Sequence, residues 1–145
     1  MTTDPLLFDD LVVGTEYPET THYISEERVR RYIEVVGDLN PLYVDEAYAR
    51  ERGFERTPAP PTIAGLFIPV WVSMWWGVAP DGTVPIKWAY KFHCPVYPGD
   101  TFRTRAKLVD KLERKNRRIA VFEITAWNSD GQRAVTGTMT AIWSA

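Results

Sequence analysis

A long segment without charged residues, residues 57–80, constrains this chain more than any other part of its sequence. Its length suggests a membrane-spanning helix, but five prolines interrupt it. The unbroken helical part is shorter than the roughly 20 residues that cross a bilayer. A helix that is apolar on all sides also occurs inside globular proteins. We therefore predict a buried central helix over residues 63–76, with a kink or late start at Pro69, and no membrane span.

The second half of the chain alternates between apolar and polar residues with the two-residue period of a β-strand. Four strands are expected, at residues 86–93, 102–108, 120–126 and 134–143. Turn sequences lie at residues 97–100, near Asn116 and at residues 128–131, and such short connections join antiparallel strands. One apolar helix and a sheet with one apolar face predict an α+β domain, in which the antiparallel sheet wraps around the helix.

The first half of the chain carries the signals of two helices. Ser25 has the side chain of an N-cap, two glutamates follow it, and Gly37 is a C-terminal stop. A shorter helix is expected between Asp45, its cap, and Gly53, its terminator. No linker, repeat or low-complexity tract divides the chain, so residues 1–145 are predicted to form a single domain. The longer helix has an apolar stripe with helical spacing at Val29, Tyr32, Ile33 and Val36.

Composition and charge narrow the possible partners. Aromatic residues make up 13% of the chain, which calls for a large apolar interior or interface. The net charge of −2 gives no reason to expect nucleic acid. Cys94 is the single cysteine, which excludes an internal disulfide and fits a reducing compartment. Because the first residues lack the pattern of a signal peptide, we expect a cytoplasmic protein. No metal-ligand spacing is present, so neither a metal nor a bound cofactor is predicted.

The most informative motif is Gly-Asp-Leu-Asn-Pro-Leu-Tyr-Val-Asp at residues 37–45, between the two predicted helices. Local physics favours an Asx-type turn, in which Asp38 and Asn40 bond nearby backbone and Pro41 stiffens the bend. The motif also resembles the Gly-Asp-x-Asn-Pro-x-His-x-Asp signature of the MaoC-like dehydratases and (R)-specific enoyl-CoA hydratases, a family with the hot-dog fold. Every position matches except one, because Tyr43 stands where the family has histidine.

Two further stretches extend the resemblance over nearly the whole chain. Ala-Pro-Pro-Thr at residues 59–62 stands where catalytic members have an Ala-His-Gly segment, and this form resembles the family's N-terminal-dehydratase branch. That branch occurs as half of a double hot dog or as one partner of a heterodimer. Val-Tyr-Pro-Gly-Asp at residues 96–100 resembles the family's turn before the long strands. By this resemblance the substrate-binding residues are Pro61, Thr62, Gly65, Tyr97 and Gly99.

The resemblance implies reversible addition of water across the 2,3-double bond of an enoyl thioester, carried by CoA or by an acyl-carrier protein. In catalytic members an aspartate and a histidine of this loop handle the water, while backbone amides of the central helix bind the thioester oxygen. Asp38, Asn40 and Tyr43 occupy the catalytic positions here. A tyrosine with a pKa of about 10 is a poor base at neutral pH, whereas a histidine near about 6.5 is well suited.

This pattern predicts a subunit of an enoyl-CoA hydratase or (3R)-hydroxyacyl-thioester dehydratase in fatty acid or lipid metabolism. It would shape the substrate site while a catalytic hot-dog partner supplies the missing base. Two alternatives stay open: a self-sufficient homodimeric hydratase that uses Asp38, and a structural or acyl-binding hot-dog protein without catalysis. A thioesterase on the same fold has no support of its own in the sequence.

The remaining candidate residues favour structural roles. His22 fits a surface or core position, and His93 and Cys94 point to opposite faces of one strand, which argues against a nucleophilic pair. The basic run at residues 114–118 fits a solvated hairpin, with attraction to CoA phosphates or an acidic carrier protein as the functional alternative. Core or interface packing is favoured over a substrate wall for three tryptophans of the central segment, Trp71, Trp75 and Trp76.

Overall fold

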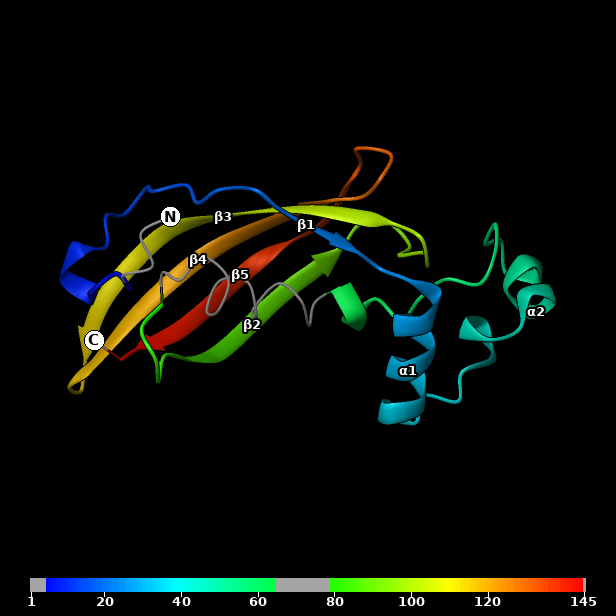
Figure 1. Cartoon of the computed structure of the whole chain (residues 1–145), viewed down its shortest axis with the longest axis horizontal. Helices are drawn as coiled ribbons and strands as arrows, with labels where there is room; N and C mark the ends of the chain where they lie inside the picture. Colours follow the sequence, from blue (N-terminus) through cyan, green and yellow to red (C-terminus); the bar gives the residue numbers. More distant parts are fainter. Residues whose placement is uncertain (1–4, 65–78, 145) are drawn as a thin grey trace.

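An antiparallel sheet organises the molecule (Figure 1). The computed structural model describes residues 5–64 and 79–144. Within them, five strands lie in the order β1-β3-β4-β5-β2, and every neighbouring pair is antiparallel. The four strands predicted in the second half of the chain are thereby confirmed. The strand bounds are β1 (Thr20–Tyr23), β2 (Val84–Phe92), β3 (Thr101–Arg114), β4 (Arg117–Trp127) and β5 (Arg133–Trp143).

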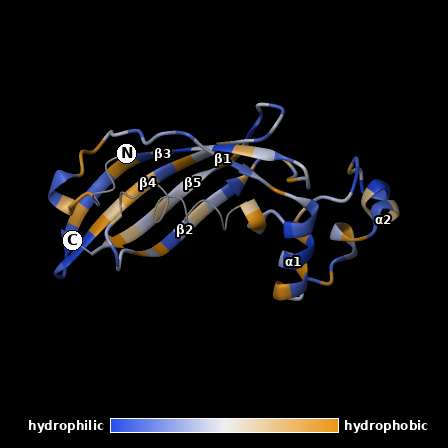
Figure 2. Ribbon diagram, in the orientation of Figure 1, coloured by the Kyte–Doolittle hydropathy of each residue, from blue (hydrophilic) through white to orange (hydrophobic). Residues whose placement is uncertain are grey.

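The alternating pattern places one face of the sheet in the core. Hydrophobic and hydrophilic bands follow one another along β3 and β4 (Figure 2). The register pairs Ala106 with Ile124 and Leu108 with Phe122, so that apolar residues of neighbouring strands meet on one face. The buried members of this face on the two strands are Phe102, Thr104, Ala106, Leu108, Ala120, Phe122, Ile124 and Ala126.

Short turns connect the long strands, as predicted. β3 and β4 are joined through Lys115 and Asn116, whose φ angles of 51° and 60° give the two-residue turn that matches strand twist. Between β4 and β5, Asn128 holds the turn together because its Oδ1 accepts from the backbone N–H of Asp130 and of Gln132. Before β3, the N–H of Asp100 donates to the carbonyl of Tyr97 at 3.1 Å.

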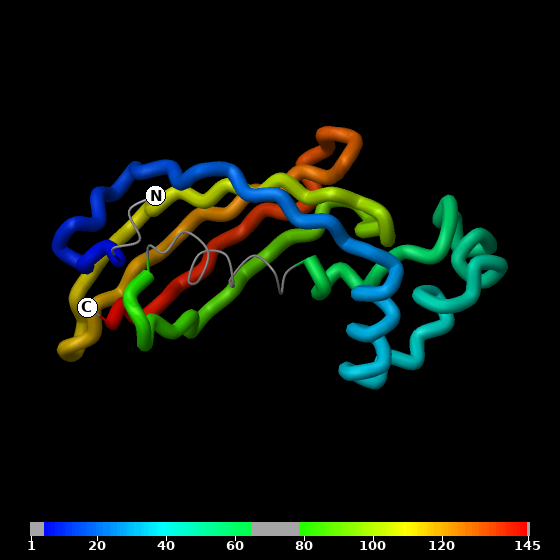
Figure 3. Tube along the Cα trace, viewed as in Figure 1, coloured from blue at the N-terminus to red at the C-terminus, as the bar shows by residue number. Residues whose placement is uncertain are grey.

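Two helices lie together at one end of the sheet, where Figure 3 shows the chain leaving β1. They are α1 (Glu26–Val36) and α2 (Glu46–Glu51), with a 3-10 turn, η2 (Pro41–Tyr43), between them. The predicted caps are confirmed, because Ser25 Oγ accepts from the N–H of Arg28, and Asp45 Oδ1 accepts from that of Tyr48. The chain then leaves α1 at Gly37, which has a left-handed φ of 68°.

The segment before β1 extends the sheet along β3. It contains a further 3-10 turn, η1 (Phe8–Asp10), and then follows β3, as Figure 3 shows. The N–H of Tyr17 donates to the carbonyl of Ala106, and the N–H of Gly14 donates to that of Leu108. This segment therefore covers the backbone of β3 that the short β1 leaves open, and it packs Phe8 into the core.

Burial differs from the prediction in two places. Val36, the last residue of the apolar stripe, is 50% exposed because α1 ends there, beyond the sheet. In β2, Tyr90 and Phe92 pack against the core, but Ile86 and Trp88 are about half exposed. β2 is an edge strand of the described sheet, and its register shifts between Pro85 and Lys87, before Trp88.

The predicted central helix lies mostly outside the described residues. Its first two residues, Ile63 and Ala64, are helical and buried, whereas residues 65–76, and with them the three tryptophans, are not described. The α+β class is confirmed for the described part of the chain. No helix of that part is long and apolar enough to cross a membrane.

Candidate functional site

The motif at residues 37–45 folds as a chain of side-chain-to-backbone hydrogen bonds. Asp38 Oδ1 accepts from the N–H of Asn40 at 3.1 Å, and Asn40 Oδ1 accepts from the N–H of Leu42 at 3.0 Å. Pro41 begins η2, where its fixed φ suits the turn. The predicted Asx turns are confirmed. Asp38 is half-buried and Asn40 is exposed, so the turn leaves the Asp38 carboxyl partly accessible from outside.

Tyr43 ends η2 and is half-buried. Burial raises the pKa of its phenol above the usual value, and the neighbouring Asp38 and Tyr32 raise that pKa further. The residue at the family's histidine position is therefore a phenol that keeps its proton at neutral pH. Asp38 and Tyr43, two of the predicted catalytic residues, do lie close enough to interact electrostatically.

A hydrogen bond between two hydroxyls joins α1 to the segment at residues 59–62. The phenol of Tyr32 is hydrogen-bonded to Thr62 Oγ1 at 2.8 Å. Thr62 is exposed and Pro61 before it is half-buried, while Gly65 lies outside the described residues. Tyr32 therefore links α1 to Thr62, and it also raises the pKa of Tyr43.

The two remaining predicted stretches are bridged to each other. The N–H of Ala59 donates to the carbonyl of Val96 at 2.7 Å, which holds residues 59–62 against the turn at residues 97–100. In that turn, Gly99 has a φ of 93°, and its N–H donates to the carbonyl of Ile24 just before α1. Tyr97 is half-buried, with the guanidinium of Arg56 4.7 Å from its ring centroid. All three stretches thus meet at the α1 end of the sheet.

An open hollow of about 510 Å³ lies between α1, η2 and this turn. Tyr43 lines it directly, and Tyr97 and Gly99 flank Pro98 in its wall. Asp38, Asn40, Pro61 and Thr62 are not among its described lining residues. Charged side chains of α1 also border the hollow, Glu26, Arg30 and Glu34. The rest of its lining is mainly apolar, Val29, Ile33, Val44, Thr57 and Pro98.

Other titratable side chains have partners of their own. His93 Nε2 is hydrogen-bonded to Thr136 Oγ1 at 2.7 Å, whereas Cys94 Sγ accepts from Asn128 Nδ2 at 3.7 Å. The two side chains therefore have different hydrogen-bond partners. Burial lowers the pKa of His22, whose Nδ1 lies 3.1 Å from the carbonyl oxygen of Thr21. Within residues 5–64 and 79–144, no group of three His, Cys, Asp or Glu side chains is arranged to hold a metal ion.

Sequence reasoning missed several contributors to the site. Tyr32 was assigned only to the apolar stripe of α1, although its hydroxyl reaches Thr62. Thr57, Arg30 and Pro98 had no signal beyond their neighbourhood, yet they line the hollow. A tyrosine in an apolar stripe is the one available clue, because a buried ring commonly finds a partner for its hydroxyl.

Comparisons with known proteins agree on one family. The family model described as "FAS1-like, dehydratase domain region" matches residues 11–137. A mitochondrial 3-hydroxyacyl-[acyl-carrier-protein] dehydratase of Arabidopsis thaliana is 30% identical over 133 residues, 91% of this chain and 77% of that protein. A UPF0336 protein of Streptomyces avermitilis is 40% identical over 58 residues. That match spans 39% of this chain and only 39% of the length of the relative.

Solved structures show the same fold. The unliganded R-hydratase PhaJ1 of Pseudomonas aeruginosa superposes with a TM-score of 0.81 and 24% identity, over 96% of this chain and 86% of that one. A chain of the C-terminally truncated HadBC (3R-hydroxyacyl-ACP dehydratase) complex of Mycobacterium tuberculosis gives a TM-score of 0.75 and 24% identity, over 91% and 96%. Likeness at this level confirms the hot-dog fold expected from the sequence.

Proposed function

Because this chain belongs to the FAS1-like dehydratase domain family of MaoC-like hot-dog proteins, we propose that it is the substrate-shaping subunit of a heteromeric enoyl-thioester hydratase or (3R)-hydroxyacyl-thioester dehydratase. A second hot-dog chain supplies the loop histidine, in whose place this chain has Tyr43. The substrate is an acyl thioester of CoA or of a carrier protein, and we expect the pair to act in the cytoplasm.

The single observation that carries the proposal is the state of Tyr43. Hydration needs a base that takes a proton from water at neutral pH, and loss of such a base typically costs about 10²–10⁴-fold in rate. Tyr43 stands at the base position with a pKa raised by burial and by Asp38. Asp38 has one carboxylate oxygen engaged by the N–H of Asn40, which suits it to positioning the loop. The loop therefore has the turn formed by Asp38 and Asn40, but the side chain at its base position is a poor base at neutral pH.

The hollow beside Tyr43 supports a role in holding the acyl group. Its apolar lining comes from Val29 and Ile33 on α1, from Val44 after η2 and from Pro98. Burial of an alkyl chain against a wall of this composition stabilises the bound state by about 0.8 kcal/mol for each buried CH₂. Glu26, Arg30 and Glu34 make its border polar, with one cation and two carboxylates. The hollow therefore has the chemistry of an acyl site with a polar mouth.

Known relatives support assembly with a partner. The HadBC structure of Mycobacterium tuberculosis is titled as a complex of a (3R)-hydroxyacyl-ACP dehydratase, and one of its chains shares this fold. Among the described strands, β2 lies at an edge of the sheet, with Trp88 49% exposed and Ile86 51% exposed. An open edge with exposed apolar side chains favours pairing with another sheet.

The test compares turnover of crotonyl-CoA by the isolated chain with turnover after addition of a catalytic homologue that bears Asp and His in this loop. We expect no measurable hydration by the isolated chain and full hydration by the pair. The variant Asp38→Asn should leave the isolated chain silent, and Asp10→Asn, an exposed carboxyl on η1, serves as its matched control.

Robust turnover by the isolated chain that disappears in Asp38→Asn would instead establish a self-sufficient hydratase. Silence with every hot-dog partner, combined with binding of acyl-CoA, would establish an acyl-binding protein without catalysis. Release of free thiol from saturated acyl-CoA would point to a thioesterase. Each of these outcomes overturns the proposal in favour of a named alternative.

A further inference from the structure

The outer face of the sheet carries a cluster of cations at the end nearest the candidate site. The cluster surrounds Trp127, the last residue of β4. The register pairs Arg103 with Trp127 and Trp127 with Arg133, so that these residues of three neighbouring strands form one row across the sheet. A parallel row pairs Arg105 with Thr125 on β4. We define the outer basic patch by its ring and its four cations, Trp127, Lys91, Arg103, Arg105 and Arg133.

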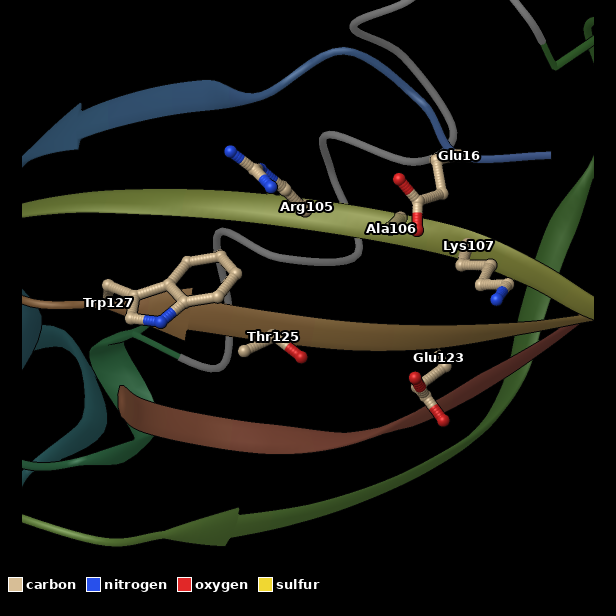
Figure 4. Close-up of a pocket in the computed structure, with 7 residues that line it drawn as sticks. All are labelled: Glu16, Arg105, Ala106, Lys107, Glu123, Thr125 and Trp127. Atoms are coloured by element: carbon tan, nitrogen blue, oxygen red, sulfur yellow. The ribbon is translucent and has the colours of Figure 1, made fainter. Parts of the chain in front are cut away.

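The patch is a joined structure rather than a chance scatter of charges. The guanidinium carbons of Arg105 and Arg103 lie 5.5 and 5.9 Å from the Trp127 ring centroid, within cation–π range. Figure 4 shows Arg105 and Trp127 projecting from β3 and β4 on the same face. Glu19 pairs with Arg103 at 3.4 Å and with Arg105 at 3.0 Å, and it fixes both side chains. With Lys107, Glu16 and Glu123, which line the adjoining hollow, this surface holds five cations and three carboxylates, a local charge of +2 on a chain whose net charge is −2.

The surface beside the patch is hollowed and polar. A shallow hollow of about 180 Å³ lies between Arg105, Thr125 and Trp127 on one side and Glu16, Lys107 and Glu123 on the other (Figure 4). A neighbouring hollow of about 410 Å³ shares Glu123 and Thr125 and continues across β5 to Arg133. Threonines, which are short, floor both hollows. Together they form a trough across three strands, about 10 Å wide from the first strand to the third.

The patch lies at the same end of the molecule as the candidate site. β3 begins directly after the turn at residues 97–100, and Arg103 is its third residue. The N–H of Thr101 donates to Ser129 Oγ at 2.8 Å, which ties that turn to the hairpin between Trp127 and Arg133. The basic hairpin at residues 114–118 is different. It closes the far end of β3, roughly 35 Å along the strand from Arg103.

We propose that the outer basic patch docks the acidic surface of the carrier protein that delivers the acyl thioester. This inference rests on the proposed function, and it names the carrier-protein thioester as the form in which the substrate arrives. A patch that spans four strands, with an aromatic ring held between cations, suits a protein surface better than a single phosphate group. Cationic patches of this kind steer acidic partners and raise their association rates. A carrier held here presents its flexible prosthetic arm at the end of the sheet where the hollow opens.

The test is made in the complete pair with the catalytic homologue. The variant Arg105→Gln/Arg133→Glu lowers the charge of the patch by 3, and Arg114→Gln/Arg117→Glu makes the same change in the far hairpin. Turnover of the crotonyl group is measured twice, once as its carrier-protein thioester and once as its CoA thioester. We expect the patch variant to lower kcat/KM for the carrier substrate about tenfold, to leave CoA turnover unchanged and to weaken the salt dependence. The hairpin variant should change neither.

Other outcomes overturn the proposal in distinct ways. A loss with the hairpin variant alone would move docking to the far end, and no loss with either variant would exclude electrostatic docking on this face. An equal loss on both substrates would assign the patch to the site itself or to CoA phosphates. Arg133→Glu alone serves where the double variant unfolds. If the pair hydrates neither substrate, the proposed function fails. Direct titration of labelled acyl-carrier protein against the chain and its two variants then still decides whether the patch binds it.

Discussion

Tyr43→His should turn this chain into a hydratase without any partner. The substitution places an imidazole at the end of η2, beside Asp38, at the one position where the loop departs from the family motif. The surrounding turn does not depend on the phenol, because its hydrogen bonds run from Asp38 to Asn40 and from Asn40 to Leu42. Imidazole is smaller than phenol, so the half-buried site can accept it without strain.

The expected gain follows from the pKa of the base. A phenol with a pKa of about 10 is deprotonated in only about one molecule in 10³ at pH 7, and the raised pKa of Tyr43 makes that fraction smaller. An imidazole with a pKa near 6.5 is neutral in about three quarters of molecules at that pH. The population of competent base therefore rises by at least about 10³-fold, within the range that a general base contributes.

The assay follows loss of the enoyl chromophore of crotonyl-CoA on addition of water. Turnover by Tyr43→His should rise with pH through about 6.5, because the neutral imidazole is the form that accepts the proton. It should vanish in Tyr43→His/Asp38→Asn. Tyr23→His, at an exposed tyrosine of β1, is the matched control and should stay silent. A folded but inactive Tyr43→His would refute the reasoning, as would robust hydration by the isolated wild-type chain that is lost in Tyr43→Phe.

Three predictions concern stability. Gly137→Ala should lower the free energy of unfolding by about 3 kcal/mol in denaturant titrations, because the new Cβ would overlap the carbonyl oxygen of Ala89 on β2; Thr138→Ala next to it should change that free energy by no more than about 0.5 kcal/mol. Burial lowers the pKa of His22 below 6.5, so the unfolded chain binds more protons near that pH. Acidification through about pH 6.5 should therefore reduce the melting temperature of the wild type more than that of His22→Gln. Lys115→Asn should raise the free energy of unfolding by about 0.5–1 kcal/mol, because asparagine tolerates the φ of 51° better than lysine.

Much of this fold was predictable because local patterns decide it. A strand that buries one face must repeat every two residues, and β4 does so from Ala120 to Ala126. Helix ends likewise need a nearby oxygen for their free N–H groups, which Ser25 and Asp45 supply. The Asx turns of Asp38 were predictable for the same reason, since each partner lies two residues away.

Burial along β2 was not predictable, because it depends on the place of the strand in the sheet. Trp88 and Tyr90 have the same phase in the sequence, yet Tyr90 packs over Gly137 while Trp88 is 49% exposed. The register sets Tyr90 opposite Gly137, which leaves room for its ring, and Trp88 opposite Met139, and the sequence alone gives neither pair. The link between Tyr32 and Thr62 has the same origin, since thirty residues separate the two hydroxyls.

Runs of charged residues in the sequence were the least reliable guide to the candidate site, and the pairing of the strands explains why. The basic run at residues 114–118 stands out in the sequence because its residues are contiguous, but contiguity there only marks a two-residue turn between long strands. Arg103 and Arg133 are thirty residues apart and attract no notice, yet antiparallel pairing sets both beside Trp127. In an antiparallel sheet, residues close to one hairpin lie far from those close to the next. The hairpin at residues 128–132 lies at the opposite end of the sheet from the turn at residues 115–116. Arg103 and Arg133, which both pair with Trp127 beside the first hairpin, therefore lie near the candidate site, and the basic run does not.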